Sequence, residues 1–313
     1  SYVQANHSWQ AVSICFVYLM DGRMISDMKL ICIGDNVVDC YLDEGVCYPG
    51  GDAVNVAVHA KRCGAEKVTY MGVFGNDAEA EHLIACMQHE GVDVNLSRRM
   101  YAASSHPGVK LNATHDRMFV GGPRDTAQQL VRMELTQMEL NQLADYDLCH
   151  TTCYSMLEHE IKVLSDRLPL SFDFSTYTND AYIDQIAPHV DYAFFSGAEL
   201  SESQETALVQ RCELLGVKLV VVTRGEAGAS AYQKGQQFRC LAKPVVAVDT
   251  MGAGDSFIAA FLTSWFQTKS PEMALRHAVE YAAHNCLEKG AFGYPMTLPH
   301  TYAHRVDPMR ERK

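Results

Sequence analysis

Apolar runs alternate along most of the chain with segments whose apolar positions recur at helical spacing. The runs predict strands at residues 30–33, 67–73, 148–154, 169–174, 192–195, 218–223 and 244–248. Helices are predicted between them at residues 53–63, 78–89, 158–167, 202–215, 255–267 and 271–288. Several runs are continuously apolar, which is typical of parallel strands covered on both faces. The pattern therefore predicts an α/β fold with a doubly wound, mostly parallel sheet flanked by helices.

Two stretches interrupt this alternation. Residues 41–48 and 100–120 mix polar and apolar positions and contain fragments of period two, which indicates antiparallel strands with one solvated face. We expect a small β-sheet lid, formed by about residues 40–48 and 99–121, over the ligand-binding edge of the main sheet. A lid that excludes water suits phosphoryl transfer, because hydrolysis is the competing reaction. An ordinary surface hairpin is the alternative interpretation of the same pattern.

One α/β domain carrying this lid is expected over residues 28–300. Residues 1–27 are interpreted as an N-terminal extension or an expression remnant, and residues 301–313 as a C-terminal tail. The apolar run at residues 11–20 is too short to cross a bilayer, and no Lys or Arg precedes it as in a signal peptide. We therefore expect no membrane association.

Charge and cysteine content narrow the class of protein. The net charge of −12 over 313 residues gives no electrostatic footprint for nucleic acid or for an anionic membrane. An anionic ligand would have to be bound by local amides, a metal ion or a few cations. The eleven cysteines lack the pattern of a small disulfide-rich protein, which favours a reducing, cytoplasmic location.

The segment Asp-Thr-Met-Gly-Ala-Gly-Asp at residues 249–255 joins an apolar run to a predicted helix. The first amides of a helix have no intrahelical acceptor and carry partial positive charge, so they bind anions. Gly252 and Gly254 allow close approach of backbone to an oxyanion. Asp255 is either a general base that takes a proton from a hydroxyl or only a helix cap. This segment favours a phosphate-handling enzyme.

Further polar residues are expected at the same edge of the sheet. Asp39, Asp173 and Asp249 lie at or just after the ends of predicted strands, where doubly wound sheets bind ligands. Residues 49–57 contain a Gly-Gly turn that opens a helix with Asn55 near its start, and residues 220–228 form a strand that runs into a glycine-rich turn. No P-loop and no Gly-x-Gly-x-x-Gly after the first strand is present, which disfavours P-loop ATPases and dinucleotide dehydrogenases.

Taken together, the segments at residues 34–39, 49–57, 220–228 and 249–255 resemble the ribokinase-like (PfkB) carbohydrate kinase family over residues 29–295. With Phe-Asp-Phe-Ser at residues 172–175, the chain is most similar within this family to the fructoselysine 6-kinases, which are fructosamine kinases. The resemblance implies ATP-dependent phosphorylation of a sugar hydroxyl. Fructoselysine is the expected substrate, and Mg2+ fits this chemistry because it prefers few carboxylates together with nucleotide oxygens.

The resemblance also implies roles for individual residues. Asp255 would be the base, and the amides of Gly252, Ala253 and Gly254 would form the anion hole. The sugar would be bound by Asp39, Gly51, Asp52 and Asn55. The nucleotide would be bound by Ser196, Thr223, Gly225 and Gly228. Glu199 would organise Mg2+ indirectly, and Asp249 would belong to a loop that binds a monovalent cation such as K+. A homodimer through the lid is expected.

Two departures from the family pattern matter. Ser196 stands where the family's Asn-x-x-Glu motif has Asn, and Asp52 stands where several sugar kinases have Lys or Asn. An acid at position 52 suits a substrate with a cationic amine, as fructosamines have. A kinase for another ketose, a sugar acid or a nucleoside remains an alternative. A sensor that binds sugar or nucleotide without turnover is the alternative from another functional class.

Overall fold

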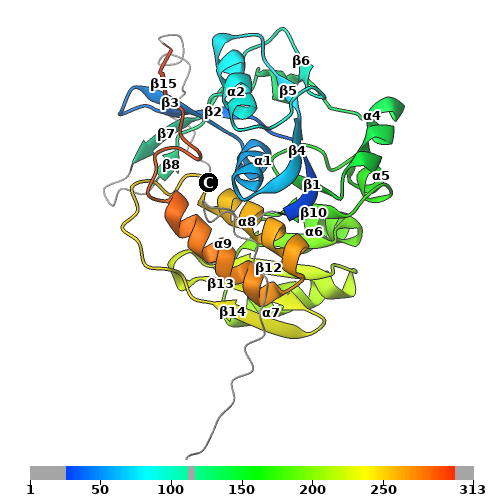
Figure 1. Ribbon diagram of the computed structural model, residues 1–313. Coiled ribbons are helices and arrows are strands. Elements are labelled where there is room, and N and C mark those ends of the chain that lie inside the picture. Colours follow the sequence, from blue (N-terminus) through cyan, green and yellow to red (C-terminus); the bar gives the residue numbers. More distant parts are fainter. Residues whose placement is uncertain (1–25, 112–116, 300–313) are drawn as a thin grey trace, which may run out of the picture.

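An eight-stranded sheet forms the centre of the computed structural model, which describes residues 26–111 and 117–299 (Figure 1). The strand order is β14-β13-β12-β11-β10-β9-β1-β4. Six strands are parallel: β1 (Ser26–Ile33), β4 (Ala65–Met71), β9 (Leu148–Thr152), β10 (Leu170–Asp173), β11 (Tyr192–Ser196) and β12 (Leu219–Thr223). At one edge, β13 (Ala229–Gln233) and β14 (Gln236–Cys240) continue the sheet antiparallel. The predicted doubly wound α/β fold is confirmed.

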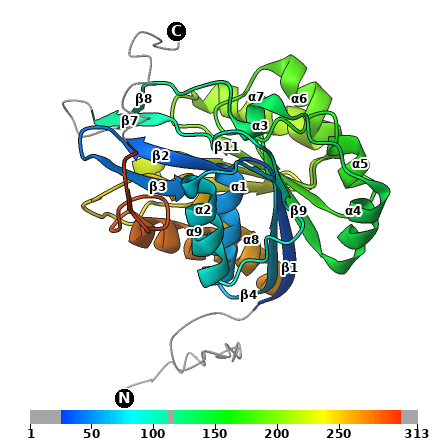
Figure 2. The same ribbon diagram turned by 90° about the horizontal axis from the view of Figure 1, so that it is seen from above.

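Helices cover both faces of this sheet (Figure 2). One side has α1 (Asp52–Arg62), α2 (Ala78–His89), α8 (Ala253–Thr268) and α9 (Pro271–Asn285). The other has α4 (Gln137–Gln142), α5 (Ile161–Ser165), α6 (Asp180–Ile186) and α7 (Glu202–Leu214). In β1, Leu30 and Cys32 pack in the first hydrophobic cluster, whereas Ile31 and Ile33 pack in the second. Because both faces are buried, the strand is continuously apolar in sequence.

The smaller sheet has the strand order β15-β3-β2-β7-β8 and projects from the main body (Figure 2). Its strands are β2 (Val37–Tyr41), β3 (Val46–Gly50), β7 (Gly108–Leu111), β8 (Arg117–Phe119) and β15 (Met296–Thr297). A separate pair is formed by β5 (Val73–Phe74) and β6 (Arg98–Arg99). The stretch from residue 99 to 121 therefore contributes β7 and β8 to the small sheet, and a short α3 (Ala127–Leu130) follows.

The domain limits expected from the sequence fall partly outside the described residues. Residues 1–25 and 300–313, which hold most of the expected extension and all of the expected tail, are not described. Ser26 already pairs with Ala65 in the main sheet, two residues before the expected start of the domain. In the described part of the chain, no helix combines the length and the hydropathy needed to cross a membrane.

Two predictions about the last strands were wrong. Residues 244–248 form no strand, and the side chain of Val246 is 91% exposed. Pro244 has no N–H to donate to a ladder, and this segment is apolar because Pro244, Val245 and Ala247 line a cavity. The hairpin of β13 and β14 was not predicted. Its turn, Lys234-Gly235, has positive φ at both residues (52° and 74°), a geometry usually signalled by Asn-Gly or Asp-Gly.

The parallel strands deliver several polar residues to one place. Asp173 ends β10, Ser196 ends β11 and Thr223 ends β12, so their side chains meet at the carboxyl edge of the sheet. Helices α1 and α8 begin at this same edge, and their first residues line the same cavity. The fold therefore combines strand ends with two helix N-termini.

Candidate active site

The N-terminus of α8 has backbone geometry that suits an anion. Gly252 precedes the helix with φ 68°, and a Cβ there would lie 2.7 Å from the Cβ of Ala291, so only glycine fits. Gly254 and Asp255 lie in the first turn, where amides have no intrahelical acceptor. The amide of Ala253 instead donates to the carbonyl of Thr250 at 3.2 Å. Nothing lies within 4 Å of a Cβ added at Gly254, so a ligand has room to approach its backbone.

The N-terminus of α1 is held by a carboxylate from another loop. Asp35 accepts hydrogen bonds from the amides of Asp52 (2.6 Å) and Ala53 (3.2 Å). Gly51 has φ 106°, and a Cβ there would lie 2.8 Å from the Cα of Asn36 and from the carbonyl oxygen of Asp35. Because Asp35 satisfies these amides, the carboxylate of Asp52 is not needed to cap its own helix.

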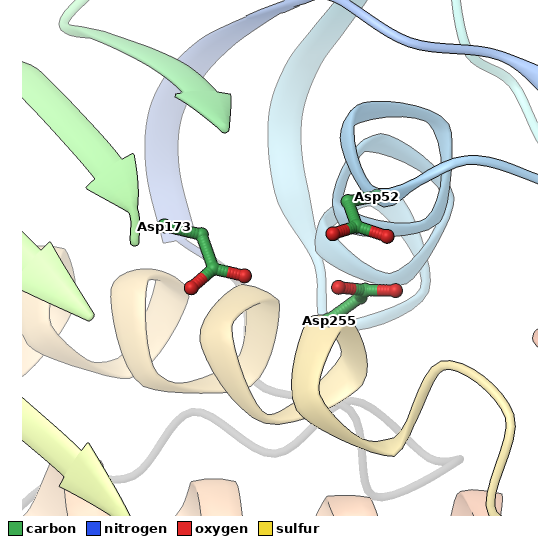
Figure 3. A group of neighbouring side chains, drawn as sticks. All are labelled: Asp52, Asp173 and Asp255. Carbon is green, nitrogen blue, oxygen red and sulfur yellow. The ribbon is translucent and has the colours of Figure 1, made fainter. Parts of the chain in front are cut away.

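Three carboxyl groups converge between these helix starts and the end of β10. One oxygen each of Asp52, Asp173 and Asp255 lies within 4.8 Å of the others. Figure 3 shows the carboxyl groups of Asp52 and Asp255 facing each other from α1 and α8, with Asp173 to one side. Asp173 and Asp255 are buried, whereas Asp52 is partly buried. Among the residues that the structure describes, no Lys or Arg forms an ion pair with any of them.

Few hydrogen-bond donors among the described residues bind to these carboxyl groups. Asp255 accepts from the side-chain amide of Asn55 at 2.7 Å, and Asp173 accepts from the backbone amide of Ser175 at 2.7 Å. Within residues 26–111 and 117–299, the carboxylate of Asp52 has no hydrogen-bond partner. The Oδ1 atom of Asn55 is buried and has no partner in the same ranges. In the described part of the chain, the carboxylate cluster therefore presents several open acceptors and no Lys or Arg paired with it, although Lys243 lines the same cavity.

Burial shifts the titration of the whole cluster. Burial raises the pKa of Asp255 well above its ordinary value of 3.8, and the nearby charges of Asp173 and Asp35 raise it further. The hydrogen bond from Asn55 lowers the pKa and so opposes this shift. Burial and the charge of Asp255 raise the pKa of Asp52 well above its ordinary range. Burial raises the pKa of Asp173 to about 7 against the opposing hydrogen bond from Ser175. The cluster therefore favours binding of protons or a cation, and Asp255 has the basicity that general-base catalysis needs.

A cavity of about 710 Å3 connects this cluster to the nucleotide-binding residues expected from the sequence. One end has Asp52, Asp173, Asp255, Ala253 and Gly254. The other end has Ser196, Thr223, Gly225 and Gly228, together with the apolar side chains of Val279, Ala282 and Ala283 from α9. Such a mixture of an apolar wall and a few convergent polar groups is typical of a ligand site.

The remaining predicted residues lie outside the cavity wall. Gly51 and Asn55 support the cluster from α1, and Asp39 lies buried on β2, near enough for its charge to raise the pKa of Asp52 and Asp255. Gly252 fixes the start of α8. Glu199 is exposed, three residues beyond Ser196.

Asp249 connects the small sheet to the loop before α8. It accepts hydrogen bonds from the hydroxyl of Tyr41 (2.7 Å) and from the amides of Met251 (2.8 Å) and Gly290 (2.9 Å). Tyr41 is the last residue of β2. The position of the lid and that of the anion-binding loop are therefore linked through one carboxylate.

Two residues near the site have contacts that the sequence motifs do not indicate. Asp173 was recognised only as an acid at a strand end and part of a motif, yet it is one of the three converging carboxyl groups. Arg224, which lies in the glycine-rich turn after β12, forms an ion pair with Glu205 and donates to the carbonyl of Leu200 at 3.3 Å. Its charge is therefore partly neutralised within the protein.

The sequence matches the pfkB family carbohydrate kinases over residues 22–296. It is 42% identical over 270 residues to the fructosamine kinase FrlD of Bacillus subtilis, covering 85% of this chain and 94% of that protein. It is 32% identical over 269 residues to the fructoselysine 6-kinase of Escherichia coli, covering 84% of this chain and 99% of that protein.

Solved structures share the fold. The ribokinase of Arabidopsis thaliana, determined with ribose and ATP, superposes with a TM-score of 0.71 at 20% identity, covering 85% of this chain and 94% of that one. A structure from Escherichia coli in complex with ATP and Mg2+ gives a TM-score of 0.70 at 23% identity, with 85% and 94% covered. The fold is therefore that of ribokinase.

The geometry at Gly51 predicts a position-specific loss of stability. Replacing Gly51 with Ala should lower the free energy of unfolding by about 1–3 kcal/mol, because the φ of 106° is strained for Ala and the Cβ meets the backbone of residues 35 and 36. Gly45 is the matched control: its φ is 67°, but nothing lies within 4 Å of an added Cβ. Urea denaturation should show a clearly larger loss for Gly51→Ala than for Gly45→Ala, and equal losses would contradict this account of the α1 N-terminus.

The raised pKa of Asp173 predicts how stability depends on pH. The folded state retains the proton up to about pH 7, whereas the unfolded state loses it near 3.8, so stability falls across this interval and is lowest above it. Across this interval, the titration of Asp173 lowers the free energy of unfolding by about 4 kcal/mol. Asp173→Asn should therefore raise the melting temperature at pH 8, by more than it does at pH 5.

Asp184 provides a control of opposite sign. A hydrogen bond from Arg211 lowers the pKa of Asp184, so its contribution is present at neutral pH and is lost as the solution becomes acidic. Asp184→Asn should not raise the melting temperature at pH 8. Circular dichroism melts at both pH values measure the effect, and a pH-independent change for Asp173→Asn would refute the assigned cause.

Proposed function

Because the chain belongs to the pfkB family of carbohydrate kinases, we propose that it transfers the γ-phosphoryl group of ATP to the 6-hydroxyl of a fructosamine such as fructoselysine. The two similar proteins named as fructosamine and fructoselysine kinases support this substrate class, since each alignment spans more than nine tenths of the relative. The observation that carries the proposal is the single cavity in which Asp255, the first turn of α8 and the strand-end residues meet.

Asp255 is proposed as the general base. Its carboxylate takes the proton of the sugar hydroxyl while that oxygen bonds to the γ-phosphorus and the bond to the β-phosphate oxygen breaks, which releases ADP. The hydrogen bond from Asn55 orients the carboxylate, and burial keeps it basic. The amides of the first turn of α8, with Gly252, Ala253 and Gly254, would bind the charge that develops on the transferred group.

The nucleotide is proposed to occupy the other end of the cavity. Thr223, Gly225 and Gly228 offer a polar turn for ribose and phosphate, and Ser196 lies on the neighbouring strand end. Val279, Ala282 and Ala283 give an apolar surface for the adenine ring. ATP in this orientation directs its γ-phosphate towards Gly254.

Mg2+, the metal that this kinase family uses with ATP, neutralises phosphate oxygens when it is bound. Glu199 would act on it through water, because its exposed side chain stands outside the cavity wall. A monovalent cation near Asp249 is a further part of the proposal. The carboxylate of Asp249 already accepts three hydrogen bonds, so such an ion would depend largely on backbone carbonyls.

The sugar is proposed to lie between α1 and the lid. Asn55 has an unpartnered, buried Oδ1 that can accept from a sugar hydroxyl, and Asp39 and the backbone of Gly51 lie at the same helix start. A cytoplasmic location is part of the proposal, since all ten cysteines in the described part of the chain are free thiols. ADP release across a panel of fructosamines, ketoses, sugar acids and nucleosides tests the substrate class.

Replacing the proposed base should abolish turnover without abolishing binding. We expect Asp255→Asn to lower kcat by about 100-fold to 10,000-fold, which is the usual contribution of a general base. The change should leave the melting temperature equal or higher, because it removes a buried carboxylate whose pKa is raised by burial. Coupled measurement of ADP release, with ATP binding measured by calorimetry as the control, checks both statements. Near-normal turnover in this variant would disprove the assignment of the base.

The lid is proposed to form a homodimer. Met118 and Phe119 are neighbours on its edge strand β8 and are 46% and 60% exposed, so this strand offers apolar surface and an open edge to a second copy. Sedimentation velocity should give the mass of a dimer for the native chain. The double change Met118→Ser and Phe119→Ser should shift it to a monomer, whereas a native monomer at micromolar concentration would contradict the proposal.

A further inference from the structure

We propose that Asp52 and Asp173 together bind the secondary ammonium group of the substrate and thereby select a fructosamine over a neutral ketose. This inference rests on the proposed function and adds to it a specificity site within the same cavity. Asp173 has no role assigned so far, and Asp52 was singled out from sequence only because an acid replaces the Lys or Asn of several sugar kinases.

The charges of the carboxyl groups around the cavity support this assignment. Asp52 and Asp173 place carboxylate oxygens within 4.8 Å of each other and of Asp255, yet in the described ranges none of the three forms an ion pair. Each carboxyl group also keeps an oxygen that accepts no hydrogen bond there. A cluster of buried acids without an internal cation is costly unless a ligand supplies the positive charge.

An acceptor atom of Asn55 points to a ligand independently of charge. The Oδ1 atom of Asn55 is an acceptor without a partner in the described ranges, on a side chain that is only 3% exposed, and the other end of the same amide touches Asp255. A buried acceptor in this state needs an O–H or N–H from a ligand. Asn55 does not itself line the cavity, but its side chain contacts Asp255 at the cavity wall, so a sugar hydroxyl that reaches this acceptor lies beside the proposed base.

The chemistry of a fructosamine fits this arrangement. Its 6-hydroxyl and its C1 amine are substituents on opposite sides of the ring oxygen of a furanose. A molecule of that shape can place the hydroxyl at Asp255 and the ammonium between Asp52 and Asp173. A secondary ammonium has two N–H donors, one for each of these carboxylates, and both hydrogen bonds are charge-assisted.

The surroundings of Asp173 suit the rest of such a substrate. The next residue but one, Ser175, lines the cavity and lies 3.1 Å from the hydroxyl of Tyr154. Tyr154 and Tyr177 pack edge to face at 6.1 Å, and each is about 40% exposed. Aromatic faces beside carboxylates favour a second cationic group, such as the α-amine of the lysine part of fructoselysine.

A metal ion is the competing occupant. Mg2+ held directly by all three carboxylates would coordinate Asp255 and reduce its basicity, which conflicts with its proposed role as base. The ammonium leaves Asp255 available for the hydroxyl proton. We therefore assign Asp52 and Asp173 to the substrate and treat direct metal binding as an outcome that the experiment must exclude.

The experiment compares a charged and a neutral substrate on three variants. KM and kcat are measured by ADP release with fructoselysine and with fructose for the native chain, Asp52→Asn, Asp173→Asn and the control Glu226→Gln. Glu226 also lines the cavity, but at its nucleotide end. For each Asp variant we expect KM for fructoselysine to rise roughly tenfold to a hundredfold, the usual loss for a charged hydrogen bond. KM for fructose should change little, and Glu226→Gln should leave the ratio of the two KM values unchanged.

Two readouts keep the result interpretable. Circular dichroism melts show that the variants fold, and calorimetric titration of fructoselysine without ATP measures binding apart from turnover. Equal losses for both sugars would overturn the inference. The inference would also be overturned if the Asp variants left the ratio of the two KM values unchanged and instead shifted the Mg2+ concentration needed for half-maximal rate. A native chain that binds fructoselysine through these residues but releases no ADP would contradict the proposed function and leave this inference standing.

Discussion

The meeting of two helix N-termini with a group of carboxylates is the interaction on which the site depends. The first amides of α1 and α8 carry partial positive charge and lie next to the three carboxyl groups. Asp35 binds the amides of α1, and Asp255 lies within the first turn of α8. These amides offset part of the cost of burying acids at the sheet edge, while the raised pKa values of Asp52, Asp173 and Asp255 show that the offset is incomplete. The same helix ends border both the proposed sugar site and the proposed phosphate site.

Much of the fold follows from sequence because the main sheet is buried on both faces. Strands β1, β11 and β12 each place apolar side chains in both hydrophobic clusters, so their sequences are apolar on both faces. The two segments whose structure the sequence did not predict, residues 244–248 and the β13–β14 hairpin, have physical explanations as well. In the segment 244–248, Pro244, Val245 and Ala247 border a cavity, a role that a linear apolar pattern does not separate from strand burial. The β13–β14 hairpin depends on the backbone of Lys234 and Gly235, for which the dipeptide is a weak signal.

The site was predictable where local backbone geometry demands particular residues. Gly51 and Gly252 have positive φ beside neighbouring backbone, and a motif that contains them marks the starts of α1 and α8. The convergence of Asp173 with Asp52 was not predictable, because it depends on how β10 is placed against α1 in the folded chain. The same holds for the ion pair of Arg224 with Glu205, which joins the turn after β12 to α7.

The hydrogen bond between Tyr41 and Asp249 links the small sheet to the start of α8. It joins residues 208 positions apart, one on a lid strand and one in the loop that leads to the anion site. Among the described residues, the amides of Met251 and Gly290 also donate to this carboxylate, so a displacement of β2 would disturb the loop that begins α8. If the proposed sugar and phosphate sites are correct, this bond would couple a sugar bound beside the small sheet to the position of the amides that bind phosphate.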